Sequence, residues 1–352
     1  MTEMKWLKAT CACFLAGLLA IGALVVIIDP FFHYHKPLKG FPYQIDNQLS
    51  QNPGMAEHLC YDSLILGSSM TVNFETDWFL EDMKLHTLKL SYNGAYPRDI
   101  HNIMEKVDEG GQELRQVFLG VDLASYSGDV LETKYPIPEY LYNKNPFDDV
   151  KYLYNKGVLL DYILKPLAER EPTDLSSVYS SEMQLEGCYS KEYVLAHYEI
   201  PEKNDAYFPE DMFIEGLEKN LEENILPLIE THPDTKFTVF FPPYSVLYWY
   251  EYICNGQMDA VMYEYNYFVE KLLSYGNVEL FFFPAQEDIV CNLDLYADTG
   301  HYRQSINHYM ETCFVDGSHR LTVNNYKEEL QKLKHLTDTY DYNALFAEEE
   351  AL

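Results

Sequence analysis

Hydrophobic residues follow two patterns along the chain, one long unbroken run near the amino terminus and many short runs after it. Residues 9–28 are 20 consecutive positions without a charged side chain. At about 1.5 Å per helical residue, such a run spans roughly 30 Å, the thickness of a bilayer hydrocarbon core. Lys5 and Lys8 precede the run, and Trp6 lies where an interfacial aromatic is expected. The pattern predicts a transmembrane helix.

The charges before the run predict a cytoplasmic amino terminus, with the rest of the chain outside the cell membrane. A cleaved signal peptide is an alternative, but it would have a shorter apolar core and a small-x-small cleavage site, which Val-Val-Ile-Ile-Asp-Pro at 25–30 does not provide. A buried core helix is a second alternative, and apolar runs of this length at a terminus are rarely of that kind. We expect a single-pass anchor, with the cytoplasmic tip and a juxtamembrane segment completing residues 1–35.

Beyond residue 35, short apolar runs alternate with longer helical patterns. Several runs are apolar at nearly every position, which is typical of strands buried on both faces of a parallel sheet. The predicted strands are Ser63–Leu66, Thr87–Leu90, Gln116–Leu123, Lys236–Phe241 and Val278–Phe283. The predicted helices are Phe74–Lys84, Pro97–Glu109, Pro209–Thr231, Gln257–Ser274 and Arg303–Phe314. This alternation predicts an α/β fold, doubly wound around a mostly parallel five-stranded sheet.

More than a hundred residues, about 124–235, separate the third and fourth predicted strands, too many for one crossover. We expect a helix at Val150–Leu164 within them, followed by a Tyr-rich acidic stretch. No linker-like sequence flanks the segment, so it is interpreted as an insertion in a single domain of residues 36–352. Insertions at that end of a sheet often cover the binding cleft. Leu321–Leu345 predicts a surface helix near the carboxyl end.

Composition excludes several classes of function. The chain has 25 basic and 56 acidic side chains, a net charge of −31, which argues against nucleic-acid binding because that depends on Lys and Arg contacts to phosphate. A hydrophobic content of 47% excludes a disordered acidic chain. The 31 tyrosines fit contact with neutral or hydroxyl-rich ligands, although tyrosines mostly pack. The seven cysteines form no CxxC pair or Cys/His cluster, so we expect neither a metal site nor a disulfide framework.

Polar residues follow the predicted strands, and ligands bind at the carboxyl ends of parallel strands. The first strand leads into Leu66-Gly67-Ser68-Ser69, a turn that places a hydroxyl and free N–H groups at a helix start. Taken alone, this turn is more simply a helix cap. Gly94 follows the second strand, and Asp122 lies at the end of the third. Tyr244 and Ser245 follow the fourth, where they are predicted to line a cleft and bind substrate.

An Asp-x-x-His sequence follows the last predicted strand. The carboxylate of Asp298 can accept a hydrogen bond from Nδ1–H of His301, leaving Nε2 free to deprotonate a serine. The same spacing recurs at Asp316 and His319, so the spacing alone carries little weight. The first pair is preferred because it lies between a strand and a helix, whereas the second follows a helix.

The order of these motifs, from about residue 62 to residue 314, resembles the SGNH/GDSL hydrolase superfamily. The resemblance implies a catalytic triad of Ser69 as nucleophile, His301 as base and Asp298 as its orienting acid, with no cofactor. It also implies an oxyanion hole formed by the N–H groups of Ser69 and Gly94 and by a third residue, which is Asn in that family. Asp122 stands there instead, and an ionised carboxylate cannot donate a hydrogen bond and repels an oxyanion.

The anchor narrows the resemblance to membrane-anchored proteins of teichoic-acid D-alanylation and alginate O-acetylation. This implies an outward-facing serine esterase or O-acyltransferase acting on a cell-envelope glycan. The expected partners are an envelope polysaccharide or its acyl donor, a membrane-bound O-acyltransferase, and the lipid bilayer through residues 9–28. The alternative, favoured by Asp122, is a catalytically silent scaffold of the same fold, or a glycan-binding accessory protein for polysaccharide modification.

Overall fold

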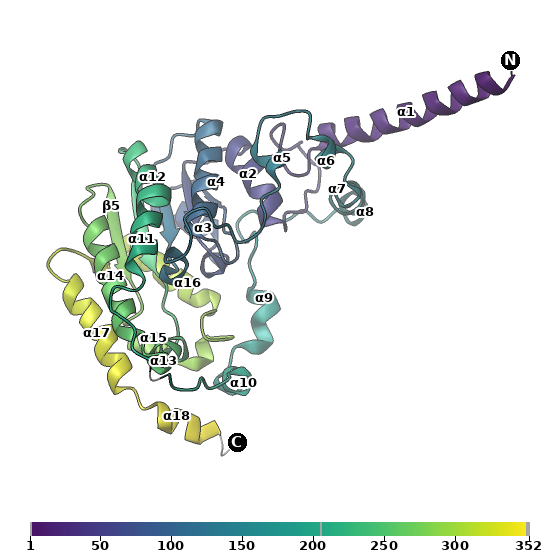
Figure 1. Cartoon of the computed structure of the whole chain (residues 1–352). Coiled ribbons are helices and arrows are strands. Elements are labelled where there is room, and N and C mark those ends of the chain that lie inside the picture. Colours follow the sequence, from purple (N-terminus) through teal and green to yellow (C-terminus); the bar gives the residue numbers. More distant parts are fainter. Residues whose placement is uncertain (1, 205, 350–352) are drawn as a thin grey trace. The chain divides into compact units, whose positions relative to one another are not determined.

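The computed structural model describes residues 2–204 and 206–349, which fall into two compact units (Figure 1). The anchor unit comprises residues up to 60 together with 103–112 and 135–174. The sheet unit comprises residues 61–102, 113–134 and the chain from 175 onward. Residues 36–60 and 135–174, which the sequence analysis assigns to the sheet domain, are therefore part of the anchor unit.

The sheet unit is built on six strands in the order β2-β1-β3-β4-β5-β6. The first five strands are parallel, and β6 pairs with β5 in the antiparallel direction. Their bounds are β1 Ser63–Leu66, β2 Thr87–Lys89, β3 Gln116–Gly120, β4 Lys236–Phe241, β5 Val278–Phe282 and β6 Arg320–Leu321. The α/β class and the mostly parallel sheet are confirmed, whereas the expected number of five strands is wrong. β6 was missed because two residues are too short to form a recognisable apolar run.

Helices cover both faces of the sheet, as adjacent aromatic side chains of β4 show. Phe240 packs against Phe314, whereas Phe241 packs against Tyr265 and Phe268, because successive strand residues point to opposite faces. The longer helices of the sheet unit are α3 Thr76–Met83, α10 Lys191–His197, α11 Ile214–Asn220, α12 Leu226–Thr231, α13 Val246–Cys254, α14 Met258–Leu272, α16 Gln304–Asp316, α17 Tyr326–Thr339 and α18 Tyr342–Glu349. Its shorter helices are α9 Glu182–Leu185, α15 Glu287–Val290 and the one-turn segments η1 Ser69–Thr71, η2 Leu123–Tyr126, η4 Glu186–Cys188 and η6 Leu293–Leu295. A π-helical segment, η5 Leu221–Ile225, joins α11 to α12.

Three predicted helices are interrupted or shortened in the structure. The helix predicted at Pro209–Thr231 begins only at Ile214. The one predicted at Val150–Leu164 breaks at Asn155, whose side chain accepts the N–H groups of Gly157 and Val158 and so starts a new helix. The one predicted at 321–345 begins with β6 and breaks again before α18, where Asp341 accepts the N–H of Ala344. Side-chain capping thus divides segments that apolar periodicity alone joins.

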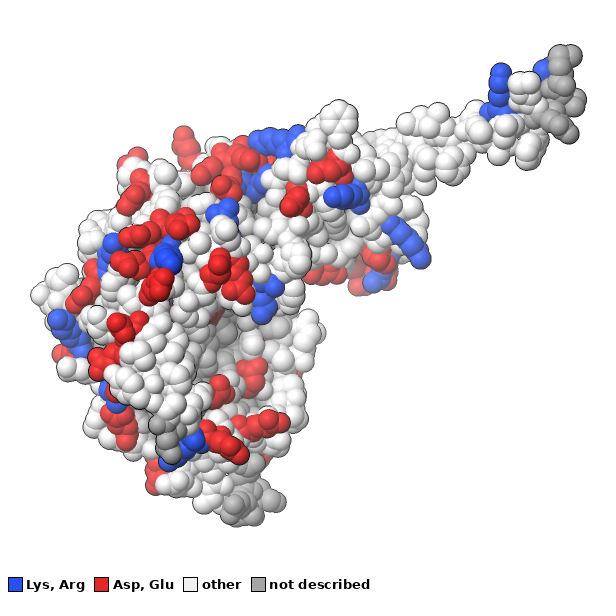
Figure 2. All heavy atoms as spheres, in the orientation of Figure 1, with Lys and Arg blue, Asp and Glu red and all other residues white. Residues whose placement is uncertain are grey.

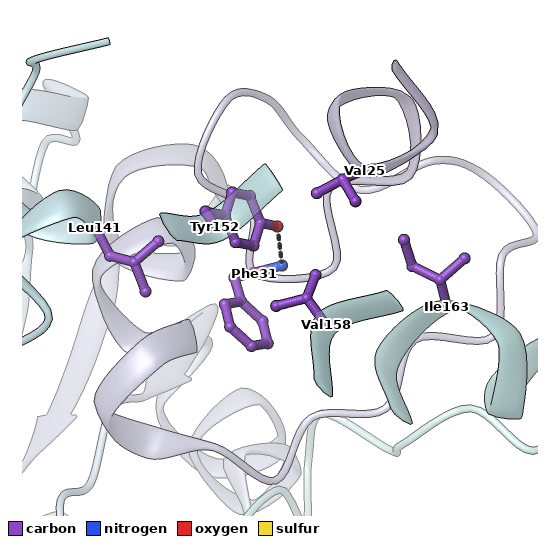
Figure 3. Close-up of a cluster of buried hydrophobic side chains, with 6 residues drawn as sticks. All are labelled: Val25, Phe31, Leu141, Tyr152, Val158 and Ile163. Atoms are coloured by element: carbon purple, nitrogen blue, oxygen red, sulfur yellow. Dashed lines mark hydrogen bonds between the residues drawn. The ribbon is translucent and has the colours of Figure 1, made fainter. Parts of the chain in front are cut away.

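The regular elements of the anchor unit are helices throughout its described residues. They are α1 Thr2–Ile28, α2 Gln48–His58, α5 Glu139–Tyr142, α6 Val150–Leu153, α7 Lys156–Leu159, the π-helical η3 Leu160–Leu164 and α8 Lys165–Glu169, and α4 Pro97–Gly110 enters from the sheet unit. α1 contains one stretch, Met4–Ile28, that is long and apolar enough to cross a membrane. The last turns of α1 pack into a buried cluster, shown in Figure 3, that consists of Val25, Phe31, Leu141, Tyr152, Val158 and Ile163.

A fully buried aspartate ends α1. Asp29 adopts a left-handed backbone conformation (φ 48°), and its carboxylate accepts the N–H groups of His33, Tyr34 and His35 at 2.7–3.0 Å. The hydroxyl of Tyr152 donates a fourth hydrogen bond to it at 2.9 Å. Four donors to one carboxylate compensate for its removal from water. This contact fixes the turn by which the chain leaves the apolar helix.

We predict that Asp29→Ala destabilises the anchor unit by about 3 kcal/mol, because it leaves three N–H groups and one hydroxyl without their shared acceptor. Hydrogen–deuterium exchange of the full-length protein measures this, and the amides of residues 33–35 should exchange about 100-fold faster. Asp46→Ala is the matched control, since the carboxylate of Asp46 is exposed and accepts a hydrogen bond from the hydroxyl of Tyr162. Equal exchange rates in both variants would contradict the role assigned to Asp29.

Candidate active site

A tight turn after β1 holds Ser69. Gly67 has φ 140°, and a Cβ at this position would lie 2.8 Å from the Cγ2 of Thr71 and 3.0 Å from the carbonyl oxygen of Gly120. Only glycine fits this conformation and this close approach to the end of β3. Ser68 then caps η1, its hydroxyl accepting the N–H of Met70 at 3.2 Å. The turn places Ser69 at the first position of η1, at the carboxyl edge of the sheet.

Ser69 and His301 meet although 232 positions separate them in the chain. The Oγ of Ser69 lies 2.8 Å from Nε2 of His301, and Nδ1 of His301 lies 2.6 Å from Oδ2 of Asp298. Because a carboxylate only accepts, Nδ1 carries the proton, and Nε2 of the neutral ring accepts the serine hydroxyl. The three residues predicted as a triad are therefore within hydrogen-bonding distance in the order the chemistry requires.

The loop that carries Asp298 and His301 is held by its own backbone. Oδ1 of Asp298 accepts the N–H groups of Gly300 and His301 at 2.8 and 2.7 Å, which closes a turn around the carboxylate. The hydroxyl of Ser245 donates to the carbonyl of Thr299 at 2.8 Å. Ser245 is fully buried and is not among the residues that line the cavity, so it supports this loop and does not occupy the substrate-binding position predicted for it.

The carbonyl of Met70 connects the serine turn to the histidine loop. It accepts the hydroxyl of Tyr302 at 3.1 Å and the side-chain N–H of Asn307 at 2.9 Å, and all three groups are buried. Tyr302 follows His301 directly, and Asn307 lies on α16, which begins at Gln304. These two hydrogen bonds fix the separation of Ser69 and His301. Neither residue was predicted, because a side chain that donates to a backbone carbonyl leaves no pattern in the sequence.

Ser69 opens into a cavity of about 580 Å³ in the sheet unit. Its walls combine small residues, hydroxyl groups and aromatic rings around the triad. The lining residues are Ser68, Ser69, Met70, Gly94, Ala95, Tyr96, Asp122, Ala124, Ser125, Tyr244, Tyr248, Asp298, Thr299, Gly300 and His301. The structure thus brings together every predicted site residue except Ser245.

The two backbone N–H groups predicted to bind an oxyanion belong to residues that line the cavity. Among the described residues, neither the N–H of Ser69 nor that of Gly94 has a hydrogen-bond acceptor. Gly94 has φ 70°, and a Cβ there would lie 2.7 Å from Cε of Lys134. The backbone conformation therefore requires glycine, and the stem of Lys134 packs where a side chain would begin. Oxyanion binding by the N–H groups of Ser69 and Gly94 stays a prediction.

Asp122, the third predicted oxyanion-hole residue, forms a hydrogen-bonded pair with Tyr244, whose hydroxyl donates to Oδ1. Burial raises the pKa of Asp122 to about 6, against the opposing effects of a hydrogen bond from Ser68 and of the charge of His301. Near pH 7 the carboxylate is therefore mostly ionised, with a protonated fraction on the order of a tenth. Ser68 and the Asp122–Tyr244 pairing are further site features that the sequence did not reveal.

The charges of the triad support one another. The hydrogen bond to Asp298 raises the pKa of His301, more than burial lowers it, and the charges of Asp298 and Asp122 raise it further. Burial alone would raise the pKa of Asp298, but hydrogen bonds and charge from His301 give a net lowering. A base with a raised pKa and an ionised orienting acid is the arrangement that general-base catalysis by histidine uses.

The second Asp-x-x-His sequence does not form such an arrangement. Nε2 of His319 lies 2.7 Å from the hydroxyl of Tyr309, and Asp316 accepts the N–H of Ser318. Burial lowers the pKa of His319. The preference for the first pair thus agrees with the structure. Within residues 2–204 and 206–349, no three His, Cys, Asp or Glu side chains are grouped closely enough to hold a metal ion.

Comparisons with known proteins give no relative for this chain: no protein-family model, no curated protein and no solved structure matches it.

The two Asp-x-x-His pairs give a prediction that can be tested within one molecule. The pKa of His301 should lie above 6.5 and that of His319 below it, because an aspartate accepts a hydrogen bond from the first ring whereas burial dominates at the second. NMR titration of histidine-labelled protein measures both values. Asp298→Asn should lower the pKa of His301, and Asp316→Asn should leave it unchanged. An unaltered His301 titration in Asp298→Asn would contradict the assigned contact.

Proposed function

We propose that this chain is a membrane-anchored serine esterase or O-acyltransferase that acts on an ester of a cell-envelope glycan. The observation that carries the proposal is the contact chain from Ser69 Oγ to His301 Nε2, at 2.8 Å, and from His301 Nδ1 to Asp298, at 2.6 Å. A nucleophile, a base and an orienting acid in this order are recognised by geometry and role, whatever the fold. The order of the motifs, which resembles that of SGNH/GDSL hydrolases, supports the same reaction class by analogy.

The proposed reaction has two steps. In the first, Ser69 Oγ attacks the ester carbonyl while its proton moves to Nε2 of His301, and the N–H groups of Ser69 and Gly94 stabilise the oxyanion. Collapse of this intermediate breaks the ester bond, and the departing alcohol takes the proton from His301. In the second, water or a sugar hydroxyl attacks the carbonyl of the acyl-enzyme while its proton moves to Nε2 of His301. The bond between the acyl carbon and Ser69 Oγ then breaks, and Ser69 Oγ takes the proton back from His301.

The cavity favours an uncharged, hydroxyl-bearing substrate. Its polar lining includes Ser125, Thr299 and Tyr96, which exchange hydrogen bonds with hydroxyl groups, and its tyrosine rings offer faces against which a sugar packs. The carboxylates of Asp122 and Asp298, together with a net charge of −31, oppose entry of polyanions. In Figure 2, acidic side chains are spread over the visible surface of the protein.

The proposed location follows from α1. Its apolar stretch Met4–Ile28 has the length and composition of a membrane span. Figure 2 shows that the shaft of α1 is free of charged side chains, with basic residues near its start, where Lys5 and Lys8 lie. The positive-inside rule then places the amino terminus in the cytoplasm and the cavity outside.

A catalytically silent scaffold, or a glycan-binding accessory protein, is the second candidate, and Asp122 is the observation that favours it. A carboxylate in the oxyanion hole opposes the charge that develops during acyl transfer, and loss of one donor there costs about 2.7–4 kcal/mol. With two backbone N–H groups in place, this penalty slows the reaction and does not abolish it. The enzyme is therefore the proposal that the site supports better.

Covalent labelling tests the proposed nucleophile. A fluorophosphonate probe should label the full-length protein at Ser69, because His301 removes the hydroxyl proton during the attack, and Ser69→Ala should abolish labelling. Ser68→Ala is the matched control and should still be labelled, since the hydroxyl of Ser68 accepts the N–H of Met70 whereas that of Ser69 contacts His301. Fluorescence of the labelled band and mass spectrometry of the modified peptide measure the outcome. Undiminished labelling of Ser69→Ala would exclude the mechanism.

Restoring the missing donor tests Asp122. We predict that Asp122→Asn accelerates phosphonylation by about 100-fold, because its amide donates to the oxyanion-like phosphonyl oxygen and a negative charge is removed. The acid limb of the pH–rate profile should also shift to lower pH, since the charge of Asp122 raises the pKa of His301. Asp122→Leu, which loses the charge without gaining a donor, should be slower than Asp122→Asn. A rate below that of the unmodified protein in Asp122→Asn would show that the carboxyl group itself assists the reaction.

A further inference from the structure

Three leucines form an exposed apolar stripe on the anchor unit. They lie on the continuous helical segment 156–169 (α7, η3 and α8), and Leu160, Leu164 and Leu167 are 39%, 46% and 46% exposed. Their spacing of four and three residues places them on one face of a helix, while Val158 and Ile163 of the same segment are buried. A continuous apolar stripe of this kind marks a surface that contacts another apolar phase.

The buried side chains of the same segment, next to the leucine stripe, attach it to α1. Val158 and Ile163 share a buried cluster with Val25, and Figure 3 shows the three side chains gathered around one space. Tyr154, two residues before the segment, packs against α1 as well, with its hydroxyl oxygen 3.2 Å from where a Cβ on Gly22 would lie. Segment 156–169 is therefore fixed to the last turns of α1 by direct packing.

That packing sets the depth of the segment relative to a bilayer. Gly22 and Val25 lie within the uncharged run 9–28, and Gly22 precedes the end of the run by six residues, about 9 Å along a helix. If the run spans the hydrocarbon core, a helix packed on these residues lies at the boundary between acyl chains and headgroups. The exposed stripe would otherwise face water there, at a cost of about 25 cal/mol per Å² of apolar area.

The flanking side chains suit the same boundary. Lys156 and Lys165 are exposed on the segment, and long basic side chains extend from an apolar surface toward headgroup phosphates. Tyr154, 43% exposed, is of the amphipathic type enriched at membrane interfaces. Acidic residues Asp161 and Glu169 on the same segment balance the lysines, so anionic lipid is not needed for this contact.

We propose that residues 156–169 form an interfacial helix that lies in the bilayer leaflet at the Ile28 end of α1, with Leu160, Leu164 and Leu167 among the acyl chains. The inference rests on the proposed membrane span of α1 and goes beyond it, because it gives the chain a second, monotopic contact with lipid. A helix lying in the interface and packed against a spanning helix restricts how α1 tilts and rotates.

Fluorescence quenching by lipid tests the contact in the full-length protein. Leu164→Trp is reconstituted into zwitterionic nanodiscs with ordinary or acyl-brominated lipid, and the emission of the unmodified protein is subtracted. Brominated lipid should reduce the added emission by about twofold or more, because bromine quenches only rings that contact it among the acyl chains. Val323→Trp, at a position 71% exposed, is the control for an aqueous tryptophan and should change little. Leu167→Trp repeats the measurement at a second position of the stripe.

The native Trp6 distinguishes failure of this proposal from failure of the anchor. Its contribution is the emission lost in Trp6→Phe, and α1 as a membrane span requires that brominated lipid quench it. If Trp6 is quenched while the tryptophans of Leu164→Trp and Leu167→Trp are not, the interfacial helix is excluded and the anchor stands. If none of the three tryptophans is quenched, both the interfacial helix and the membrane span of α1 are excluded. Quenching of all three, with Val323→Trp unaffected, is the expected result.

Discussion

The carbonyl oxygen of Met70 is the contact on which the candidate active site depends. It belongs to the turn that carries Ser69. It accepts hydrogen bonds from Tyr302, which follows His301 in the loop, and from Asn307, which lies on the helix α16 after that loop. A serine and a histidine on separate loops would otherwise sample many separations, and a shift of about 1 Å is enough to lose most of the advantage of a positioned base. The two buried donors, Tyr302 and Asn307, restrict that freedom by binding the one carbonyl of Met70, although neither side chain takes part in the chemistry.

The protonation states of His301 and Asp122 determine the electrostatics of the site. The hydrogen bond to Asp298 raises the pKa of His301 and burial raises the pKa of Asp122 to about 6, and the charge of each of these two groups shifts the pKa of the other. The reactive state needs a neutral His301, and an ionised Asp122 opposes the oxyanion. When the two groups share a single proton, however, the more stable arrangement has that proton on His301 and leaves Asp122 ionised. Groups coupled in this way titrate as a pair, and a rate profile reports the pair and not either residue. Tyr244, which donates to Asp122, stabilises the ionised form and so favours the unreactive arrangement.

The sequence predicts those parts of the structure that follow from burial and topology. Apolar runs identify the five parallel strands, because both faces of such a sheet are covered, and the carboxyl-edge rule brings His301 to the serine turn although the chain between them is long. Contacts made by helix capping or by single polar atoms are not predicted by these patterns. Asn155 interrupts a helix that periodicity extends through it, and Arg320–Leu321 is too short to register as a strand. Tyr302 and Asn307 act through a backbone carbonyl, which every residue has, so no sequence pattern distinguishes them.

Contacts within the protein fix the carboxyl-terminal end of α1, at Ile28. A carboxylate at a helix carboxyl terminus is unfavourable because the helix dipole is negative there, so Asp29 would be expected to remain in water. Instead it is fully buried, with three backbone N–H groups and the hydroxyl of Tyr152 directed at it. These donors exist only if the chain reverses direction immediately after Ile28, and the reversal places Phe31 in the cluster beside Val25. The helix therefore cannot lengthen or unwind at this end to suit a thicker or thinner bilayer. Because the proposed interfacial helix also restricts tilting, adaptation to bilayer thickness must occur at the other end of α1 or in the lipid itself.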